Sequence, residues 1–233
     1  MKRLALTAAA VLVGACSTSD GGAFLEDTCD LTPVTDDFAR AAGAAAPGAW
    51  QETLGPGGDG VTLSLAAKDG RPAPSLAIET SLPSATARAR TWSRPLANGS
   101  ASGCAELVVA LRVDAVEGGA AGFASLRFAG GASYALRITP DLALVLVERG
   151  ATAAEDHELA RAPLAKGTWT TIDLLAWSGA AGATPPVLQL DGRTVETALP
   201  ARARGAIESV TLGLEESGPS PRASFALDDL DVR

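Results

Sequence analysis

Acidic residues gather near both ends of the chain: Asp36 and Asp37 early, and Asp228, Asp229 and Asp231 late. Carboxylate oxygens are the ligands that calcium prefers, which makes Asp36, Asp37, Asp228 and Asp229 candidate ligands for that metal. Acids at strand ends also serve a plainer purpose, since charge on a sheet edge discourages pairing with other chains. The plainer interpretation is favoured, because the acids lack the fixed spacing of a calcium-binding loop.

Catalytic motifs are missing from the sequence. The chain has one histidine, His157, with no HExxH around it, and no GxSxG elbow. The stretch GPGGDG, residues 55–60, matches GxGxxG but leads into the strand-like VTLSL, so it predicts a turn and not a phosphate site. We therefore expect no catalytic residue, no cofactor apart from the calcium considered above, and no enzymatic activity.

Three tryptophans are candidate ligand-binding residues: Trp50, Trp92 and Trp177. An exposed indole stacks on a sugar ring or anchors a protein interface. The alternative is that each lies in the core, which the chain must build with few aromatic residues. Trp177 is the best candidate for exposure, because it ends an apolar run and enters the Gly/Ala-rich stretch SGAAGATPP.

The N-terminus reads as a secretory leader. Lys2 and Arg3 precede an apolar run over residues 4–15, which is shorter than the roughly 20 residues of a transmembrane helix. The motif VGAC, ending at Cys16, resembles the lipobox of bacterial lipoproteins, and this resemblance implies a lipidated Cys16 that anchors the protein to a membrane. By the sorting rule of that class, Ser17 favours the outer membrane of the cell envelope. The alternative is an ordinary cleaved signal with a coincidental cysteine.

The charge of the chain limits its possible partners, and its cysteines bear on the compartment in which it folds. The formal net charge is −8 and becomes more negative when Lys2 and Arg3 leave with the leader, so we expect no nucleic-acid partner. Cys29 and Cys104 are the two cysteines left for the exported domain. In an oxidising compartment such a pair is usually bridged, and we predict a Cys29–Cys104 disulfide. Two separately buried thiols are the alternative.

Apolar runs of strand length fill the rest of the sequence. CAELVVALRVDAV, residues 104–116, predicts a long central strand, and residues 123–150 give three shorter runs separated by Gly-Gly and Pro-Asp. About a dozen such runs predict one all-β sandwich. Two Ala-rich segments, residues 38–46 and 153–161, are interpreted as loops with helical turns.

The order of motifs in the second half resembles a known fold. KGTWTTIDLLAW (residues 166–177) gives a turn and a strand beginning near Trp169, and VLQLDGRTV (187–195) gives a hairpin closed by Asp191-Gly192. The final ASFALDDLDVR (223–233) reads as a closing strand, and DDF (36–38) as an opening one. This order resembles the laminin-G-like and concanavalin A-like lectin/glucanase jelly roll, over residues 35–233.

The resemblance implies an antiparallel two-sheet jelly-roll sandwich whose first and last strands lie side by side, which would bring the two acidic groups together. Glucanases of this fold carry acids at alternate positions of one strand, whereas here Glu106 stands alone on its strand and Asp173 has no acid two residues away.

The chain is expected to divide into a leader (1–15), a lipidated tether (16–34) and the jelly roll (35–233). We predict a membrane-anchored envelope lipoprotein that binds a surface glycan or protein. A structural or assembly lipoprotein without a small ligand, or a glycan hydrolase, is the alternative.

Overall fold

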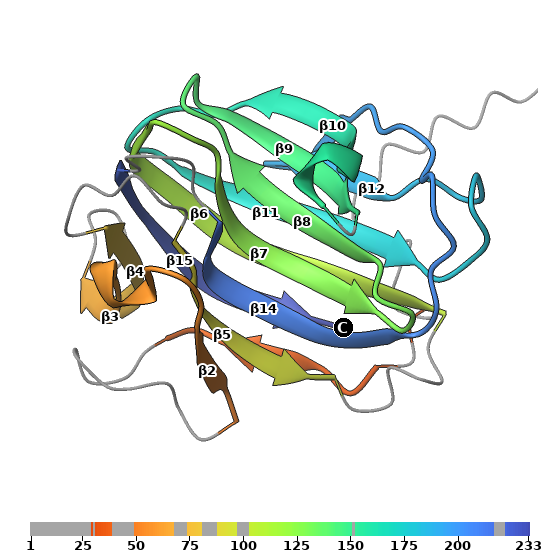
Figure 1. Ribbon diagram of the computed structural model, residues 1–233, viewed down its shortest axis with the longest axis horizontal. Coiled ribbons are helices and arrows are strands. Elements are labelled where there is room, and N and C mark those ends of the chain that lie inside the picture. Colours follow the sequence, from red (N-terminus) through yellow and green to blue (C-terminus); the bar gives the residue numbers. More distant parts are fainter. Residues whose placement is uncertain are drawn as a thin grey trace, which may run out of the picture.

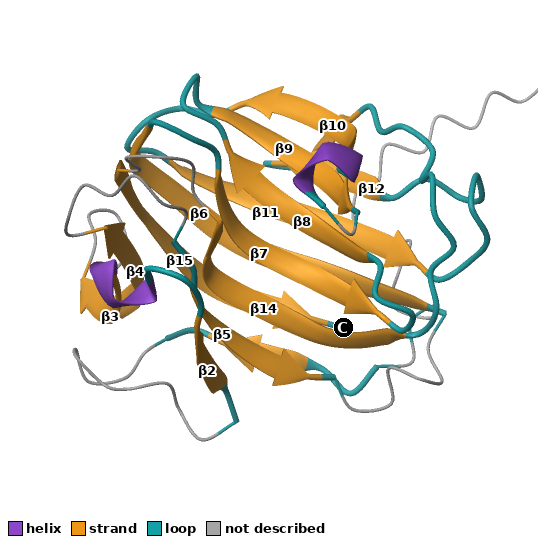
Figure 2. Ribbon diagram, viewed as in Figure 1, coloured by secondary structure: helices purple, strands orange, loops and turns teal. Residues whose placement is uncertain are grey.

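The computed structural model describes residues 29, 31–38, 49–67, 74–80, 88–96, 103–150, 152–216 and 222–233. Within these ranges the chain consists of strands with two short 3-10 turns, η1 (Gly58–Gly60) and η2 (Ala153–Glu155), as Figure 2 shows. The strands form two antiparallel sheets that pack face to face (Figure 1). The predicted all-β two-sheet sandwich is confirmed.

Sheet A is the rear layer in Figure 1 and holds eight of the described strands. Its main order is β13-β12-β11-β6-β15-β4-β3, and β1 pairs with the last part of β15. The bounds are β1 Val34–Asp36, β3 Val61–Ala67, β4 Pro74–Thr80, β6 Cys104–Glu117, β11 Trp169–Trp177, β12 Val187–Leu190, β13 Arg193–Val195 and β15 Arg222–Val232.

Sheet B is the front layer in Figure 1, with seven described strands in the order β10-β9-β8-β7-β14-β5-β2. The bounds are β2 Gln51–Leu54, β5 Arg90–Pro95, β7 Ala121–Phe128, β8 Ser133–Ile138, β9 Ala143–Arg149, β10 His157–Pro163 and β14 Ile207–Glu216. The η2 turn lies in front of this sheet, near β8 and β9 (Figure 2).

The core lies between the sheets and follows the period-2 alternation of strands. On β6 the inward residues are Leu107, Val109 and Leu111, each at most 1% exposed, and on β14 they are Val210 and Leu212. Aliphatic side chains supply most of this core, and the rings of Phe123 and Phe225 meet edge to face across it. The core is therefore built mainly from the aliphatic residues that are abundant in the sequence.

Several local predictions are confirmed. Asp191 and Gly192 both have positive φ, at 49° and 74°, as a type I′ turn between β12 and β13 requires. The GPGGDG stretch is a turn, with Gly57 in the left-handed region and η1 after it. The first strand lies beside the last one, since Val34 faces Val232 in the β1–β15 pair.

One local prediction was wrong. Residues 153–161 were expected to form a loop with helical turns, yet only η2 is helical and β10 begins at His157. Strand β10 pairs with β9 and buries Leu159, so tertiary pairing outweighs the local helix propensity of its alanines. His157 is exposed at the start of this edge strand. Most of the other Ala-rich segment, 38–46, lies outside the described residues.

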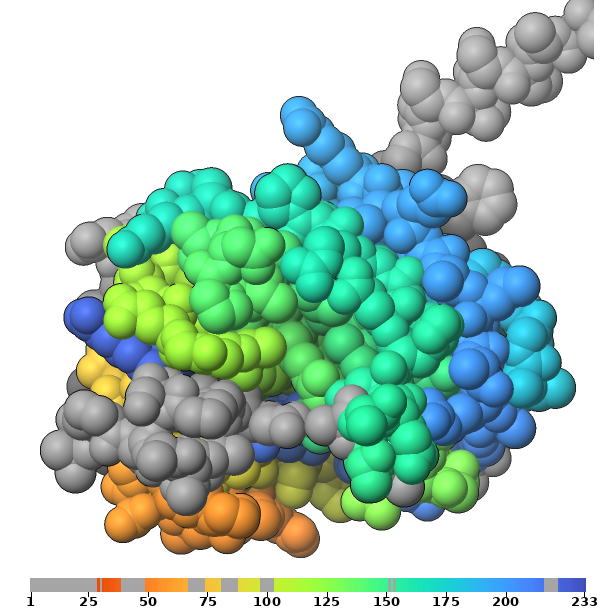
Figure 3. All heavy atoms as spheres, turned by 45° about the horizontal axis from the view of Figure 1, so that its top comes forward, coloured from red at the N-terminus to blue at the C-terminus, as the bar shows by residue number. Residues whose placement is uncertain are grey.

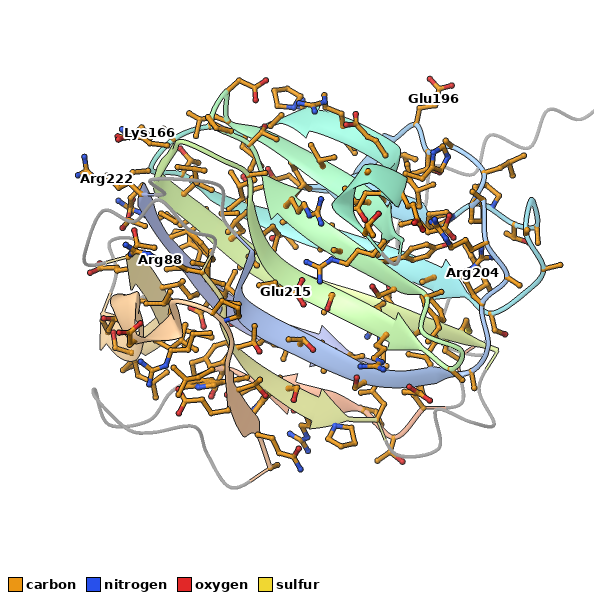
Figure 4. The ribbon with its side chains drawn as sticks, in the orientation of Figure 1. Arg88, Lys166, Glu196, Arg204, Glu215 and Arg222 are labelled. Carbon is orange, nitrogen blue, oxygen red and sulfur yellow. A yellow bond between two sulfur atoms is a disulfide. The ribbon has the colours of Figure 1, made fainter. Side chains whose placement is uncertain are left out.

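A buried ion pair closes one end of the sandwich. The side chains of Arg204 and Glu148 are fully buried, 4.0 Å apart, and Glu148 also accepts the backbone N–H groups of Ala201 and Arg202. The guanidinium of Arg204 donates to the carbonyl of Trp177 on sheet A and lies over the ring of Tyr134 on sheet B. Figure 4 shows Arg204 toward one end of the molecule, where it ties the two sheets together.

Candidate ligand-binding face

The outward side of sheet B, called face B here, carries a row of short polar side chains. Gln51 on β2, Ser93 on β5, Thr211 on β14 and Ser125 on β7 are successive register partners across four strands. The strand neighbours of these residues, such as Trp92 and Leu212, point into the core. Alternation therefore points all four polar side chains away from the core, although Ser125 is only 5% exposed. The three hydroxyl groups and the amide of Gln51 are together called the hydroxyl row.

A charged cluster adjoins the Ser125 end of this row. Ser125 Oγ donates a hydrogen bond to Glu215 Oε1 at 2.7 Å, and Arg149 Nη2 lies 3.2 Å from Glu215 Oε2. Since β7 and β8 separate Arg149 from Glu215, the arginine lies flat across both strands. Figure 4 shows Glu215 near the middle of the front face, over β7 and β14. The side chain of Glu215 is only 8% exposed.

Two glycines make this arrangement fit. A Cβ on Gly122 would lie 3.3 Å from Glu215 Cβ and 3.6 Å from Arg149 Nη2, so any larger residue would require Glu215 to shift by a few tenths of an ångström. Gly213 has φ of +123°, and a Cβ there would lie 2.5 Å from the Arg90 carbonyl oxygen. It sits in the β-bulge where the β14–β7 register shifts between Leu212 and Glu216, and this bulge sets Glu215 beside Gly122.

A second ion pair lies under the η2 segment. Arg137 Nη2 of β8 contacts Asp156 Oδ2 at 2.7 Å, and Asp156 Oδ1 accepts the Gly150 N–H. Arg137 faces Gly122 across the β8–β7 pair, so both ion pairs adjoin the same glycine. In Figure 3 the teal residues around η2 stand beside the green strands of this face. The charged cluster is thus Ser125, Arg137, Arg149, Asp156 and Glu215.

Face B can bind a ligand through hydrogen bonds. Guanidinium groups only donate and carboxylates only accept, so each ion pair offers both functions side by side. A sugar hydroxyl donates and accepts at once, and neighbouring hydroxyls match such a pair. The charges are held in place before any ligand arrives, which lowers the entropic cost of binding.

The outward side of sheet A, called face A here, arranges its charges differently. Asp173 on β11 and Glu106 on β6 share a hydrogen bond, and Glu106 also contacts the guanidinium of Arg233. Burial and then the charge of Glu106 raise the pKa of Asp173 to about 6, while Arg233 opposes the shift. Neither acid has a second acid two residues away on its own strand, but the fold brings the two together across β6 and β11.

Face A also carries the disulfide. Cys29 and Cys104 are bridged, with their Cα atoms 5.2 Å apart, and this confirms the predicted pairing. Cys104 is opposite Trp177 in the β6–β11 pair and on the same side of the sheet as Glu106. Trp177 is half-buried at the end of β11. The N-terminal segment is therefore joined to the molecule on face A, beside the one candidate tryptophan that reaches the surface.

Trp50 and Trp92 are core residues, and their assignment as ligand-binding residues is corrected. Trp92 is 1% exposed and Trp50 is 6% exposed. The Nε1–H of Trp50 donates to Asp36 Oδ2 at 3.0 Å, which uses its polar atom inside the fold. Neither ring offers a face to a ligand, because both are needed to fill a core that has few aromatic residues.

The acidic residues meet, but they do not form the candidate calcium site. The β1–β15 pair brings Asp36, Asp37 and Asp229 to one shallow hollow with Asp231. Asp36 is turned inward, however, where it accepts the Phe38 N–H and the Trp50 Nε1–H. Asp228 is 3% exposed and accepts the Asp229 N–H. Across the described ranges no three acidic, histidine or cysteine side chains are placed to hold a metal ion.

Sequence reasoning missed the charged cluster on face B. Its members come from β7, β8, β9, β14 and the η2 loop, and no two of them lie within six residues of each other in the chain. A pattern search within single strands cannot detect such a set. One signal was available: the two glycines Gly122 and Gly213 interrupt apolar strands, and glycine inside a strand often marks a bulge or a close approach.

The lipidation site, Cys16, lies outside the described residues. No helix in the described ranges has the length and apolar character needed to cross a bilayer.

Known structures share this fold at low sequence identity. No family model matches the chain, and no curated protein matches it. The cellulose-induced protein Cip1 is 14% identical with a TM-score of 0.62, and the match covers 86% of this chain and 96% of that one. Alginate lyase Aly36B is 12% identical with a TM-score of 0.58, over 86% and 96% of the two chains.

A sialidase is also similar, at 12% identity and a TM-score of 0.60, over 86% of this chain but only 18% of its own. At such identities the likeness defines the fold alone. The fold is a concanavalin A-like jelly roll of two antiparallel sheets.

Proposed function

We propose that this protein is a lipid-anchored envelope lipoprotein whose jelly roll binds a surface glycan through face B without catalysing a reaction. The hydroxyl row and the adjoining charged cluster carry this proposal. They present fixed donors and acceptors on one surface, in an arrangement that suits sugar hydroxyls. Two of the similar structures bear the names of glycan-directed proteins, an alginate lyase and a sialidase.

The binding role is preferred to hydrolysis because the acids of face B are paired with arginines. Glycoside hydrolysis uses one carboxyl group as a proton donor and a second as a nucleophile or base. On face B, Glu215 and Asp156 are each engaged by a guanidinium group. That engagement suits a fixed binding surface better than a proton-transfer pair.

The site of the tether supports the choice of face. The disulfide joins the N-terminal segment to face A, so a lipid anchor at Cys16 would be connected to the domain through the face opposite face B. Face B would then be free to meet a glycan. A disulfide also fits an extracytoplasmic compartment, which the envelope provides.

A pull-down on insoluble polysaccharides tests the glycan role. We expect the purified protein to be retained, and the double variant Arg149→Met/Glu215→Gln to pass through. Retention should persist in a calcium chelator, because the charged cluster contains no metal-binding set. Passage of the unmodified protein through every polysaccharide would contradict the glycan role and favour a structural lipoprotein.

Cys16→Ser should move the protein from the membrane fraction to the soluble fraction, and an unchanged distribution would refute the anchor.

A further inference from the structure

The edge strands of the two sheets differ in how well they are protected from pairing with another chain. Among the described residues, β1, β2 and β13 are at most four residues long. Strand β10 is longer, but it carries Glu158 and Arg161, is interrupted by a bulge and ends at Pro163. Short length, charge, bulges and proline all discourage pairing at an edge.

Strand β3 has none of these protections. It spans Val61–Ala67 with the sequence VTLSLAA, which contains no charged residue and no proline. Its register with β4 is continuous over the whole strand, without a bulge. It is the outermost strand of sheet A and lies near the left margin of the molecule in Figure 1. An edge of this kind is a template on which another strand can pair.

The outer side of β3 has backbone groups free to form such a pair. Only the first residue bonds an element other than β4: Val61 donates its N–H to the Gly58 carbonyl and accepts from Arg90 Nη1 at 2.9 Å. For residues 62–66, the described part of the chain provides hydrogen bonds from β4 alone. A strand placed here would bond the remaining N–H and C=O groups, as inside a sheet.

Partly exposed leucines lie on the same side of the sandwich. Leu63 packs against the core but is less buried than Val61 and Leu65, its neighbours on the same face of β3. Leu54, at the end of β2, is 59% exposed. Its register partner is Arg90, whose guanidinium contacts Val61, so Leu54 lies near the start of β3. A partner on this edge would cover apolar surface as well as backbone groups.

The sequence of β3 is complementary to a second copy of itself. Antiparallel pairing about a two-fold axis at Ser64, the middle residue, is the only alignment that pairs all seven residues. It sets Leu63 opposite Leu65 of the second copy on the core side, and Thr62 opposite Ala66 on face A. Side chains of like polarity would therefore meet. No like charges oppose one another in the pair, although the chain has a formal net charge of −8.

We infer that a second copy of this protein pairs with the outer edge of β3, so that the two copies of sheet A join into one continuous antiparallel sheet. The dimer is independent of the proposed glycan binding, which uses face B.

Sedimentation equilibrium of the Cys16→Ser protein tests the dimer, because this substitution removes any association through a lipid anchor. We expect a reversible monomer–dimer equilibrium at micromolar concentrations. Adding Ser64→Lys would set two positive charges opposite each other at the two-fold axis, and Ser64→Glu two negative charges. Each should weaken dimerisation at least tenfold. An equal mixture of the two variants should associate again, because opposite charges then meet.

Thr171→Lys is the matched control, since Thr171 is exposed on β11 of the same sheet, far from β3 in the strand order. It should leave dimerisation unchanged, and equal melting temperatures would show that all variants fold. A monomer at every concentration would refute the inference. Equal dimerisation of the Ser64→Lys and Thr171→Lys variants would place the interface away from β3. Failure of the Lys and Glu variants to associate with each other would refute the two-fold pairing at Ser64.

Discussion

On face B the carboxylates of Glu215 and Asp156 each lie against an arginine from another strand, whereas on face A the carboxyl groups of Glu106 and Asp173 lie against each other. Both arrangements are partly shielded from water. On face B an arginine balances the charge of each acid and holds its side chain in place. On face A burial, and then the charge of Glu106, raise the pKa of Asp173 to about 6.

The difference distinguishes the proposed binding face from the face that carries the disulfide. Face B keeps its donors and acceptors in fixed positions over a floor of small residues. Face A carries the disulfide and the acid Asp173, whose pKa is raised to about 6. Four experiments test this division, from the largest expected effect to the smallest.

Removal of the disulfide should have the largest effect, and only on stability. The double variant Cys29→Ser/Cys104→Ser opens a cross-link between residues 75 positions apart, which should lower the free energy of unfolding by about 4 kcal/mol. Urea denaturation measures this loss. Retention on polysaccharide at low temperature should be unchanged, because face B lies on the other sheet. A loss below about 1 kcal/mol would show that the cross-link contributes little.

Arg149→Met should affect stability and binding together. It leaves the shielded carboxylate of Glu215 without its guanidinium, which should cost about 2–3 kcal/mol in the free energy of unfolding. Adding Glu215→Gln should recover most of the stability, because the uncompensated charge is removed, but not the binding.

Arg161→Met is the matched control. Arg161 pairs with Glu158 on the surface, with 45% and 48% of the two side chains exposed, and its loss should cost under about 1 kcal/mol. Equal losses for the two arginine variants would contradict the special role of the pair on face B.

Gly122→Ala should weaken binding more than it weakens the fold. The new Cβ would meet Glu215 Cβ at 3.3 Å and displace the acid, at a cost of roughly 1 kcal/mol in stability. Retardation in polysaccharide gels should fall several-fold. Gly103→Ala is the control, since the nearest atom to its new Cβ would be Ser178 Oγ at 3.9 Å. If the two variants bind alike, the floor of face B is not part of the site.

Asp173→Asn should change the pH dependence of stability. The folded pKa of Asp173 is about 6 and the ordinary value for an aspartate is 3.8, so the folded state binds the proton more tightly. The resulting cost is absent below about pH 4 and fully present above about pH 7, and stability falls as pH rises between these limits.

The Asn variant removes that fall and should raise the melting temperature at pH 7.5 by roughly 2 °C. Its amide can still donate a hydrogen bond to Glu106. Melting curves from pH 4 to pH 8 provide the measurement. A variant that keeps the slope of the unmodified protein would assign the titration to another group, and binding through face B should be unaffected in either case.

Local patterns predicted much of the fold. The alternation on β6 and the turn at Asp191-Gly192 depend on neighbouring residues, so the sequence shows them directly. The pairing of the first and last strands came from the resemblance to jelly rolls and is also confirmed. Strand β10 was missed, because its alanines and charged residues favour helix and only its pairing with β9 makes it a strand.

The site was harder to predict than the fold, for the same physical reason. Trp50 and Trp92 were candidates for binding because side-chain chemistry alone cannot say whether an indole is buried. Glu106 and Asp173 looked isolated because they stand 67 positions apart and meet only through the β6–β11 register.

The sequence by itself determined the sandwich, its aliphatic core, the two cysteines available for a bridge and the leader-like N-terminus. These properties follow from composition, from the period of two along each strand and from short turns, all of which are local. Only the tertiary structure decided which charges meet. Pairing between strands set Arg149 against Glu215 and Glu106 against Asp173, because these contacts join residues that are far apart in the sequence and depend on which strands become neighbours.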